Sequence, residues 1–378
     1  MSKPVSDGPV ALFVDPIHRG YEGDRLFTLS AGAGAGEDIN APWIHLRERL
    51  GRAGVRVHTA DLLESGAVAP AARNVYLSFG PKHRHQNLVS RFGVVLSGFF
   101  ALECPIVEPR LYLDLHTLSR SFKTMYSFST AESLRPFLKG PLEVEQFHLP
   151  NAHDRVHEEQ WGRTDRGFLA MINANKLPRL YVQELYTERL RAVEFFNRRG
   201  EIDLYGIGWD GPSFRVGVTR VPARLRRLGH VARSRWEGFR PSSDPLRVAT
   251  RVAWRGAVAS KAEVLSRYTF AICFENMVLE RWITEKIFDC FLAGTIPVYL
   301  GAPDITRWIP PECFVDMRRF NGYEELREYL QQLSPAEIDA YRHAARDYLR
   351  SESFAPFTKE AFAELVAGIV SRDGGVAA

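Results

Sequence analysis

Two near-continuous apolar runs, "FAICF" at residues 270–274 and "TIPVYL" at 295–300, place the strongest constraint on the fold. Apolar runs without polar alternation are typical of parallel strands that are covered by helices on both faces. The segment between them is long enough for a connecting helix, whose buried stripe would be Ile287, Phe288, Phe291 and Leu292. This pattern predicts a strand, helix, strand unit with Glu275, Glu285 and Lys286 at the rim of the sheet, not in the core.

The same alternation extends over the rest of the chain, and it favours an α/β fold with parallel sheets. A chain of 378 residues exceeds one ordinary core, so we expect two domains, with a linker in the polar stretch 150–166. The predicted division is 1–155, 165–352, and a C-terminal helix and tail at 353–378. Strands are predicted at 10–14, 55–60, 74–79, 93–101, 168–175 and 202–209, and helices at 41–54, 185–200, 322–332, 335–350 and 355–371.

Composition places the chain among soluble globular proteins, since 45% of its residues are hydrophobic and 25% are charged. The net charge of +4 is mild and gives no reason to expect a nucleic-acid partner. An arginine-rich run at 220–240 is compatible with a solvated surface or with a patch for anionic membranes or glycolipid head groups. Neither a signal peptide nor a long apolar span is present in the sequence, so we expect a cytoplasmic protein, with peripheral contact at the inner membrane face as an option.

Other sequence signals argue against metal and disulfide chemistry. The four cysteines are far apart and show no CxxC spacing, so we expect buried free thiols. The glycine-rich stretch "LSAGAGAGED" (29–38) lacks the spacing of a phosphate-binding loop and is interpreted as a flexible surface loop. No DxD triplet occurs in the chain, so we expect neither a metal nor another cofactor.

The start of the helix after "FAICF" suits an anionic ligand. Thr284 is a candidate N-cap, and Lys286 would add a full positive charge to the free N–H groups of the first turn. Such a site fits a pyrophosphate, with Glu285 able to accept hydrogen bonds from sugar hydroxyls. The alternative interpretation is a surface helix with a Lys286–Asp289 ion pair on its exposed face.

The stretch "YTFAICFENMVLERWITEKIFDCFLAGTIPVYLGAP" (268–303) closely resembles the donor-binding signature of family 10 glycosyltransferases, the α-1,3/4-fucosyltransferases. The resemblance implies two Rossmann-like α/β domains that face one another across a cleft, the GT-B type of fold. One departure is Trp282, which stands where the family has tyrosine and so removes a phenolic O–H. The donor-binding residues implied in this stretch are Glu275, Asn276, Trp282, Thr284, Glu285 and Lys286.

Weaker similarity extends outward from this stretch. "MINAN" resembles a family segment that ends in Ser-Asn, which implies a donor-binding role for Asn175. Arg189 corresponds to a diphosphate-binding arginine, although the spacing from Asn175 is several residues longer than in the family. "LECPIVEP" resembles the family's Glu-Ser-Pro, whose glutamate is the catalytic base, and this implies Glu103 as the base. The residues alone leave Glu108 as an equally good candidate.

The resemblance implies an inverting transfer of fucose from GDP-fucose to a hydroxyl of a glycan acceptor, in surface-polysaccharide or glycolipid assembly. A base deprotonates the acceptor hydroxyl, which displaces the nucleoside diphosphate from the anomeric carbon, while protein cations take the place of a metal. A transferase of the same fold with another nucleotide sugar stays open because of Trp282. A non-catalytic nucleotide-sugar-binding protein and a nucleotide-sugar epimerase are the remaining alternatives.

Overall fold

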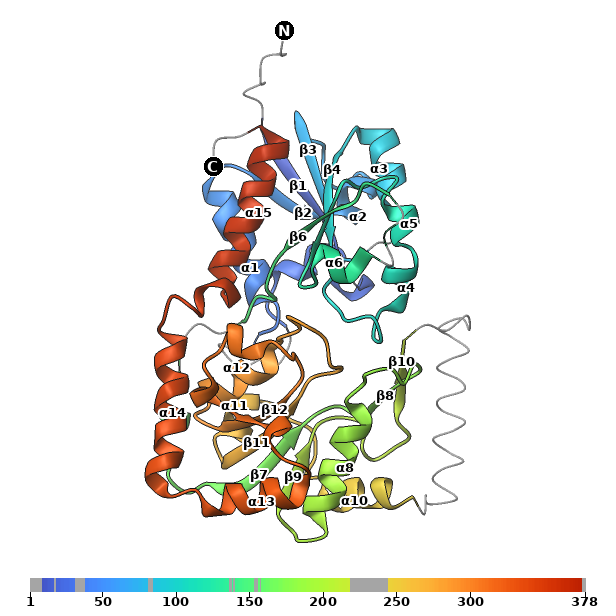
Figure 1. Cartoon of the computed structure of the whole chain (residues 1–378). Helices are drawn as coiled ribbons and strands as arrows, with labels where there is room; N and C mark the ends of the chain where they lie inside the picture. The colour runs from blue at the N-terminus through green and yellow to red at the C-terminus, as the bar shows by residue number, and fades with distance from the viewer. Residues whose placement is uncertain are drawn as a thin grey trace. The chain divides into compact units, whose positions relative to one another are not determined.

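The protein forms two compact α/β units in a computed structural model, which describes residues 9–16, 18–30, 38–80, 84–135, 138, 140–152, 156, 158–217 and 244–375 (Figure 1). Unit 1 comprises residues 1–103, 110–154 and 355–378, and unit 2 comprises 104–109 and 155–354. Each unit is built around a sheet of parallel strands, which confirms the α/β fold predicted from the alternation of strands and helices.

The sheet of unit 1 has six parallel strands in the order β2-β1-β3-β4-β5-β6. Its strands are β1 (Val10–Asp15), β2 (Arg56–Thr59), β3 (Arg73–Ser78), β4 (Val95–Phe100), β5 (Thr124–Ser127) and β6 (Glu143–Gln146). Its helices are α1 (Ala41–Arg52), α2 (Ala60–Ser65), α3 (Arg84–Phe92), α4 (Pro109–Leu113), α5 (Leu115–Leu118), α6 (Ala131–Leu134) and α15 (Lys359–Gly374).

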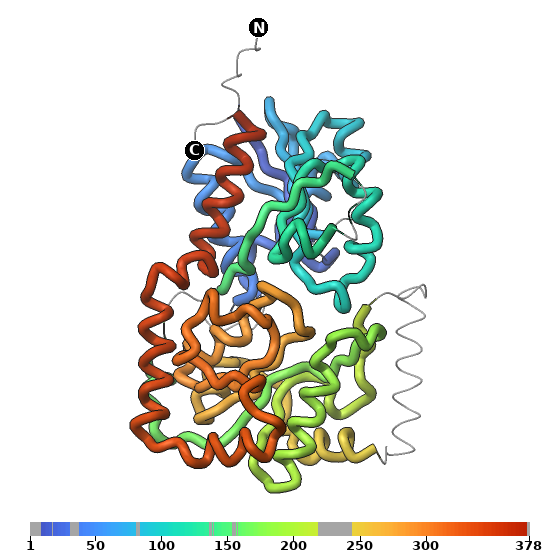
Figure 2. The backbone as a smooth tube through the Cα atoms, viewed as in Figure 1, coloured from blue at the N-terminus to red at the C-terminus, as the bar shows by residue number. Residues whose placement is uncertain are grey.

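Helices cover both faces of this sheet. Leu46 of α1 and Val366 of α15 pack in one core cluster with β1 and β3, whereas Leu88 of α3 and Leu115 of α5 pack in a second cluster. Figure 2 shows how the C-terminal end of the chain returns to lie beside α1. The last helix of the chain therefore belongs to the hydrophobic core of the first unit.

The main sheet of unit 2 has five parallel strands in the order β13-β12-β11-β7-β9, and a two-stranded sheet pairs β8 with β10. The strands are β7 (Gly167–Ile172), β8 (Lys176–Pro178), β9 (Ile202–Tyr205), β10 (Phe214–Val216), β11 (Tyr268–Phe274), β12 (Ile296–Leu300) and β13 (Val315–Asp316). The helices are α7 (Glu158–Trp161), α8 (Tyr186–Asn197), α10 (Pro245–Ala253), α11 (Lys261–Leu265), α12 (Glu285–Leu292), α13 (Tyr323–Gln332) and α14 (Pro335–Leu349).

The two apolar runs 270–274 and 295–300 form neighbouring central strands, as the sequence predicts. Phe270 of β11 pairs with Ile296 of β12, and the two strands are buried over nearly their whole length. The intervening helix, α12, begins at Glu285 and buries the predicted apolar stripe. Gly294 follows its C-terminus with φ of +67°, a left-handed conformation that glycine adopts without strain.

Two predictions from the sequence fall on residues outside this description. The arginine-rich run at 220–240 lies within residues 218–243, and the glycine-rich part of the loop 29–38 lies within residues 31–37; both segments are outside the described residues. All four cysteines are buried free thiols, as predicted. None of the helices in the described ranges has the length and apolar character needed to cross a bilayer.

Candidate functional site

A cavity of about 370 Å³ opens at the carboxyl edge of the main sheet of unit 2. The chain leaves β7 toward β9 at one edge of the sheet and later enters β11 on the other side of β7. Such a reversal of strand order leaves a crevice beyond the strand ends, and ligands of open α/β sheets bind there. The cavity is lined by Ile172, Asn173, Ala174, Lys176, Gly206, Ile207, Val258, Lys261, Leu265, Ala271, Ile272, Cys273, Glu285, Lys286, Asp289 and Cys290.

Glu275 follows β11 and has no exposed surface, so the prediction that this charge lies at the rim is wrong. Its carboxylate accepts hydrogen bonds of 2.9 Å from the backbone N–H and the hydroxyl of Thr284, and Lys286 Nζ lies 3.3 Å from Oε2. A buried carboxylate is tolerated when a counter-charge and hydrogen-bond donors replace the lost water. Gly301 leaves room for it, since a Cβ there would lie 2.5 Å from Glu275 Cγ.

Thr284 occupies the predicted N-cap position of α12, but its side chain makes no capping hydrogen bond to the helix. Its hydroxyl donates to Glu275 instead. A buried carboxylate without a hydrogen-bond donor costs more free energy than an N–H group at the helix end without a side-chain acceptor. The same hydroxyl accepts a 2.9 Å hydrogen bond from Lys286 Nζ. Thr284 therefore connects the carboxylate after β11 with the lysine in the first turn of α12.

Glu285 and Lys286 both line the cavity, and their role in ligand binding stays a prediction. The Glu285 carboxylate lies 3.5 Å from Lys286 Nζ. The Glu285 side chain is 48% exposed and only partly desolvated, and the positive charges of Lys286 and Lys261 outweigh this desolvation and lower the pKa of Glu285 to about 2. Burial likewise opposes the charged form of Lys286, whereas Glu275 and Glu285 raise the pKa of Lys286 above its ordinary value. Both side chains are thus ionised around neutral pH.

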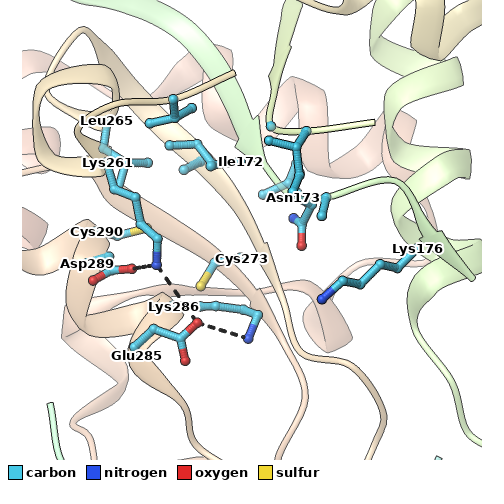
Figure 3. A pocket seen from close by; sticks show the side chains of 16 residues that line it. Ile172, Asn173, Lys176, Lys261, Leu265, Cys273, Glu285, Lys286, Asp289 and Cys290 are labelled. Atoms are coloured by element: carbon cyan, nitrogen blue, oxygen red, sulfur yellow. Dashed lines mark hydrogen bonds and ion pairs between the residues drawn. The ribbon is translucent and has the colours of Figure 1, made fainter. Parts of the chain in front are cut away.

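A second ion pair, missed by the sequence analysis, lies beside the first (Figure 3). Lys261, at the start of α11, lies 2.8 Å from Asp289 Oδ2 and 4.0 Å from Glu285 Oε1. Burial raises the pKa of Asp289, although Lys261 opposes this shift. The proposed Lys286–Asp289 surface pair is wrong, since each partner pairs elsewhere. No local pattern signals the Lys261–Asp289 pair, because the two residues come from different helices.

Arg189 lies in α8 with 4% of its surface exposed, and it is not among the residues that line the cavity. Its guanidinium donates to the carbonyl of Phe274 at 3.1 and 2.6 Å and to Asn276 Oδ1 at 3.1 Å. Burial lowers its pKa from the ordinary value, with nearby negative groups opposing the shift. Arg189 and Asn276 therefore hold the carboxyl end of β11 in place.

Asn175 is buried just after β7, and its amide donates to the carbonyls of Gly208 at 2.8 Å and Gly211 at 3.0 Å. These bonds anchor the loop after β9 beside the loop after β7. The neighbours Asn173 and Lys176 line the cavity, and neither was singled out from the sequence. Lys176 directly follows the strand predicted at 168–175, and this position is the signal that could have identified it. Asn173 falls inside the predicted strand, because β7 ends earlier than predicted, at Ile172.

Trp282 is 1% exposed and lies in the loop before α12, outside the set of residues that line the cavity. The indole thus packs into the interior of unit 2, in a position where it does not shape the cavity wall. The missing phenolic O–H at this position was the reason to consider a different donor, and that alternative stays a prediction.

The two candidate bases lie on either side of a turn. Glu103 is the last residue of its segment in unit 1 and follows β4, whereas Glu108 belongs to the segment 104–109 of unit 2. Both are partly buried, and the backbone N–H of Glu108 donates to the carbonyl of Cys104 at 3.1 Å. The Glu103 carbonyl accepts a 2.7 Å hydrogen bond from the Tyr112 hydroxyl, which fixes its backbone.

Among the described residues, no group of three or more His, Cys, Asp or Glu side chains is arranged to hold a metal ion. The carboxylates nearest the cavity are already paired with lysines. Metal independence stays a prediction.

The fold of two parallel α/β units is that of the GT-B glycosyltransferases. The structure of WaaG, described as a glycosyltransferase involved in lipopolysaccharide biosynthesis, covers 95% of this chain and is itself covered completely, with a TM-score of 0.51 and 12% identity. At this identity, the likeness concerns the fold alone.

Residues 250–354 match "Glycosyltransferase family 10 (fucosyltransferase) C-term", which confirms the resemblance read from residues 268–303. Over 76 residues, or 20% of its length, the chain is 38% identical to "Alpha-(1,3)-fucosyltransferase FucT" of Helicobacter pylori, of which the match covers 16%. It is 33% identical over 84 residues, or 22% of its length, to "Alpha-(1,4)-fucosyltransferase" of Arabidopsis thaliana, of which the match covers 21%. The similarity in sequence thus spans about a fifth of the length of these curated relatives.

Proposed function

We propose that this protein is an inverting glycosyltransferase that transfers fucose from GDP-fucose to a hydroxyl of a glycan acceptor. The observation that carries the proposal is the overlap of two independent features. The segment that matches the fucosyltransferase family, residues 250–354, supplies Lys261, Glu285, Lys286 and Asp289 to a cavity at the switch point of a parallel sheet.

In the proposed reaction, Glu103 takes the proton of the acceptor hydroxyl while the hydroxyl oxygen attacks the anomeric carbon of the sugar. The bond from that carbon to the diphosphate oxygen breaks, and GDP leaves with the electron pair. Lys286 would stabilise the charge that develops on the leaving diphosphate. The other residues implied by the resemblance would support the donor site indirectly, by fixing the loops and strand ends that surround it. These residues are Asn175, Arg189, Glu275, Asn276, Thr284 and Trp282.

The acceptor is proposed to be a surface polysaccharide or a glycolipid. A cytoplasmic location and a contact between the basic run 220–240 and anionic membranes are further predictions of this proposal. The second candidate, a transferase for another nucleotide sugar, keeps the same cavity and cations but differs in the nucleobase that it accepts.

A thermal-shift panel of GDP-, UDP- and dTDP-sugars tests the proposal, because a ligand at 100 times its dissociation constant adds about 2.7 kcal/mol to the free energy of unfolding. GDP-fucose is expected to raise Tm, and UDP- and dTDP-sugars are expected to leave it unchanged. A rise with UDP-sugars and none with GDP-sugars would favour the second candidate. Binding of GDP-fucose without any transfer to glycan acceptors would indicate a non-catalytic binding protein.

A further inference from the structure

Three lysines line the cavity of unit 2, and they differ in their partners. Lys286 lies within 4 Å of Glu275 and Glu285, and Lys261 lies 2.8 Å from Asp289. Within the described parts of the chain, Lys176 forms no ion pair with a carboxylate. It is therefore the cavity lysine whose charge is still available to a ligand.

The cavity wall formed by α11 and α12 carries little uncompensated positive charge. Two ammonium groups, of Lys261 and Lys286, face three carboxylates there, of Glu275, Glu285 and Asp289. The N-terminus of α12 is also compensated, since Glu275 accepts the N–H of Thr284. A diphosphate placed against this wall alone would meet more negative than positive charge, and its binding requires a further cation.

Lys176 is placed to supply that charge. It is exposed, is the first residue of β8, and follows the carboxyl end of β7 at the switch point of the sheet. In Figure 3, Lys176 and Lys286 extend toward the same part of the cavity from opposite sides.

The backbone around Lys176 is fixed, so the side chain starts from a defined position. Its N–H donates to the carbonyl of Ala174 at 2.8 Å, and it lies opposite Phe214 in the pairing of β8 with β10. The preceding residue, Asn175, accepts the N–H of Phe214 at 2.9 Å and donates to the loop after β9. A ligand that contacts Lys176 would thus restrict one flexible side chain and leave the backbone unchanged.

We propose that Lys176 binds the phosphate groups of the nucleotide as a second cation opposite Lys286, so that the diphosphate lies across the β7–β11 switch point. The inference rests on the proposed function and deepens it. Lys176 begins the stretch between Asn175 and Arg189 that is longer than in the fucosyltransferase pattern. In this chain, Lys176 would contact the diphosphate, whereas the buried Arg189 is held by the carbonyl of Phe274.

Calorimetric titration of the full chain with GDP, GMP and guanosine tests the proposal, with Lys176→Ala, Lys176→Arg and the control Lys123→Ala. Lys123 is an exposed lysine next to β5 in unit 1, so its removal changes the net charge equally. Lys176→Ala is expected to weaken GDP binding by about tenfold or more, because a charge-assisted hydrogen bond is lost. The loss should be smaller for GMP and absent for guanosine, and Lys176→Arg should retain most of the GDP affinity.

Each contrary outcome points to a different error. If the wild type binds GDP and Lys176→Ala binds it equally well, the assignment of Lys176 is wrong and the proposed function survives. An equal loss for GDP and guanosine would place Lys176 at the base or ribose and overturn its phosphate role. A wild-type chain that binds no nucleoside diphosphate would overturn both the proposed function and this inference.

Discussion

Arg189 shows how one residue can be important for a site without facing it. The guanidinium binds the last carbonyl of β11 and the side chain of Asn276, and these contacts fix the strand end from which Glu275 emerges. Through these contacts, its role is structural.

Replacement of this arginine is expected to affect stability. Arg189→Leu leaves the buried Phe274 carbonyl without its donor, which should lower the free energy of unfolding by about 2 kcal/mol in chemical denaturation. The matched control is Arg191→Leu on the same helix, because Arg191 is exposed and forms a surface ion pair with Glu188 at 3.0 Å. Unchanged stability together with weakened GDP binding in Arg189→Leu would assign the residue to the ligand instead.

Glu285 gives a prediction about pH. Its pKa falls from 4.5 to about 2 in the folded chain, since the positive charges of Lys286 and Lys261 outweigh the partial desolvation of a side chain that is still 48% exposed. A lowered pKa stabilises the folded state above the unfolded pKa, and this contribution is lost as the pH falls toward the folded pKa. The difference in unfolding free energy between wild type and Glu285→Gln should therefore shrink as the pH falls from about 5 toward 2.

Denaturation series at several pH values would measure this difference, with Glu280→Gln as a control at an exposed glutamate in the preceding loop. A difference between wild type and Glu285→Gln that stays constant over this range would show that the two lysines do not stabilise the ionised carboxylate.

At the scale of elements, the site depends on how closely the loops after β7 and β9 approach each other. Gly206, directly after β9, has φ of +125°, and a Cβ at this position would lie 2.1 Å from the carbonyl oxygen of Asn173. Two cavity-lining loops thus meet backbone to backbone, and only glycine permits this distance.

Gly206→Ala should lower the free energy of unfolding by about 2 kcal/mol or more and also weaken GDP binding, because the backbone of Asn173 must move. Gly200→Ala is the matched control: φ is +67° there, but no atom lies within 4 Å of the new Cβ. It should cost about 1 kcal/mol and leave GDP binding unchanged. Equal effects of the two substitutions would mean that strain in φ, and not the approach of the loops, is the cause.

Sequence patterns identified β11, α12 and β12 because these elements are encoded locally, by apolar runs and by a helical apolar stripe. The ion pairs and hydrogen bonds between the side chains of the site could not be predicted in this way. Lys261 meets Asp289 only because α11 packs beside α12, and Glu275 is buried only because Thr284 and Lys286 return to it. Such contacts depend on tertiary packing, which no short window of sequence contains.

At the scale of the whole molecule, the proposed donor site and the proposed base belong to different units. Glu103→Gln keeps the size of the side chain but removes the proton acceptor, so turnover should fall by about 10²–10⁴-fold while GDP affinity stays nearly unchanged. Glu108→Gln should have a much smaller effect. A fucose-transfer assay and GDP titration of both variants provide the measurements, and a reversed order of the two effects would move the base to Glu108.

The packing of α15 in unit 1 has a consequence for synthesis on the ribosome. Phe362, Val366 and Val370 lie in the same apolar cluster as Val10 and Val75, so the first unit lacks part of its interior until α15 has emerged. All residues of the second unit are available earlier, by Phe354. Since domains tend to fold as units while the chain grows, the second unit should reach its native state first. A nascent chain arrested before α15 should therefore expose the uncovered face of the β1–β3 region to chaperones.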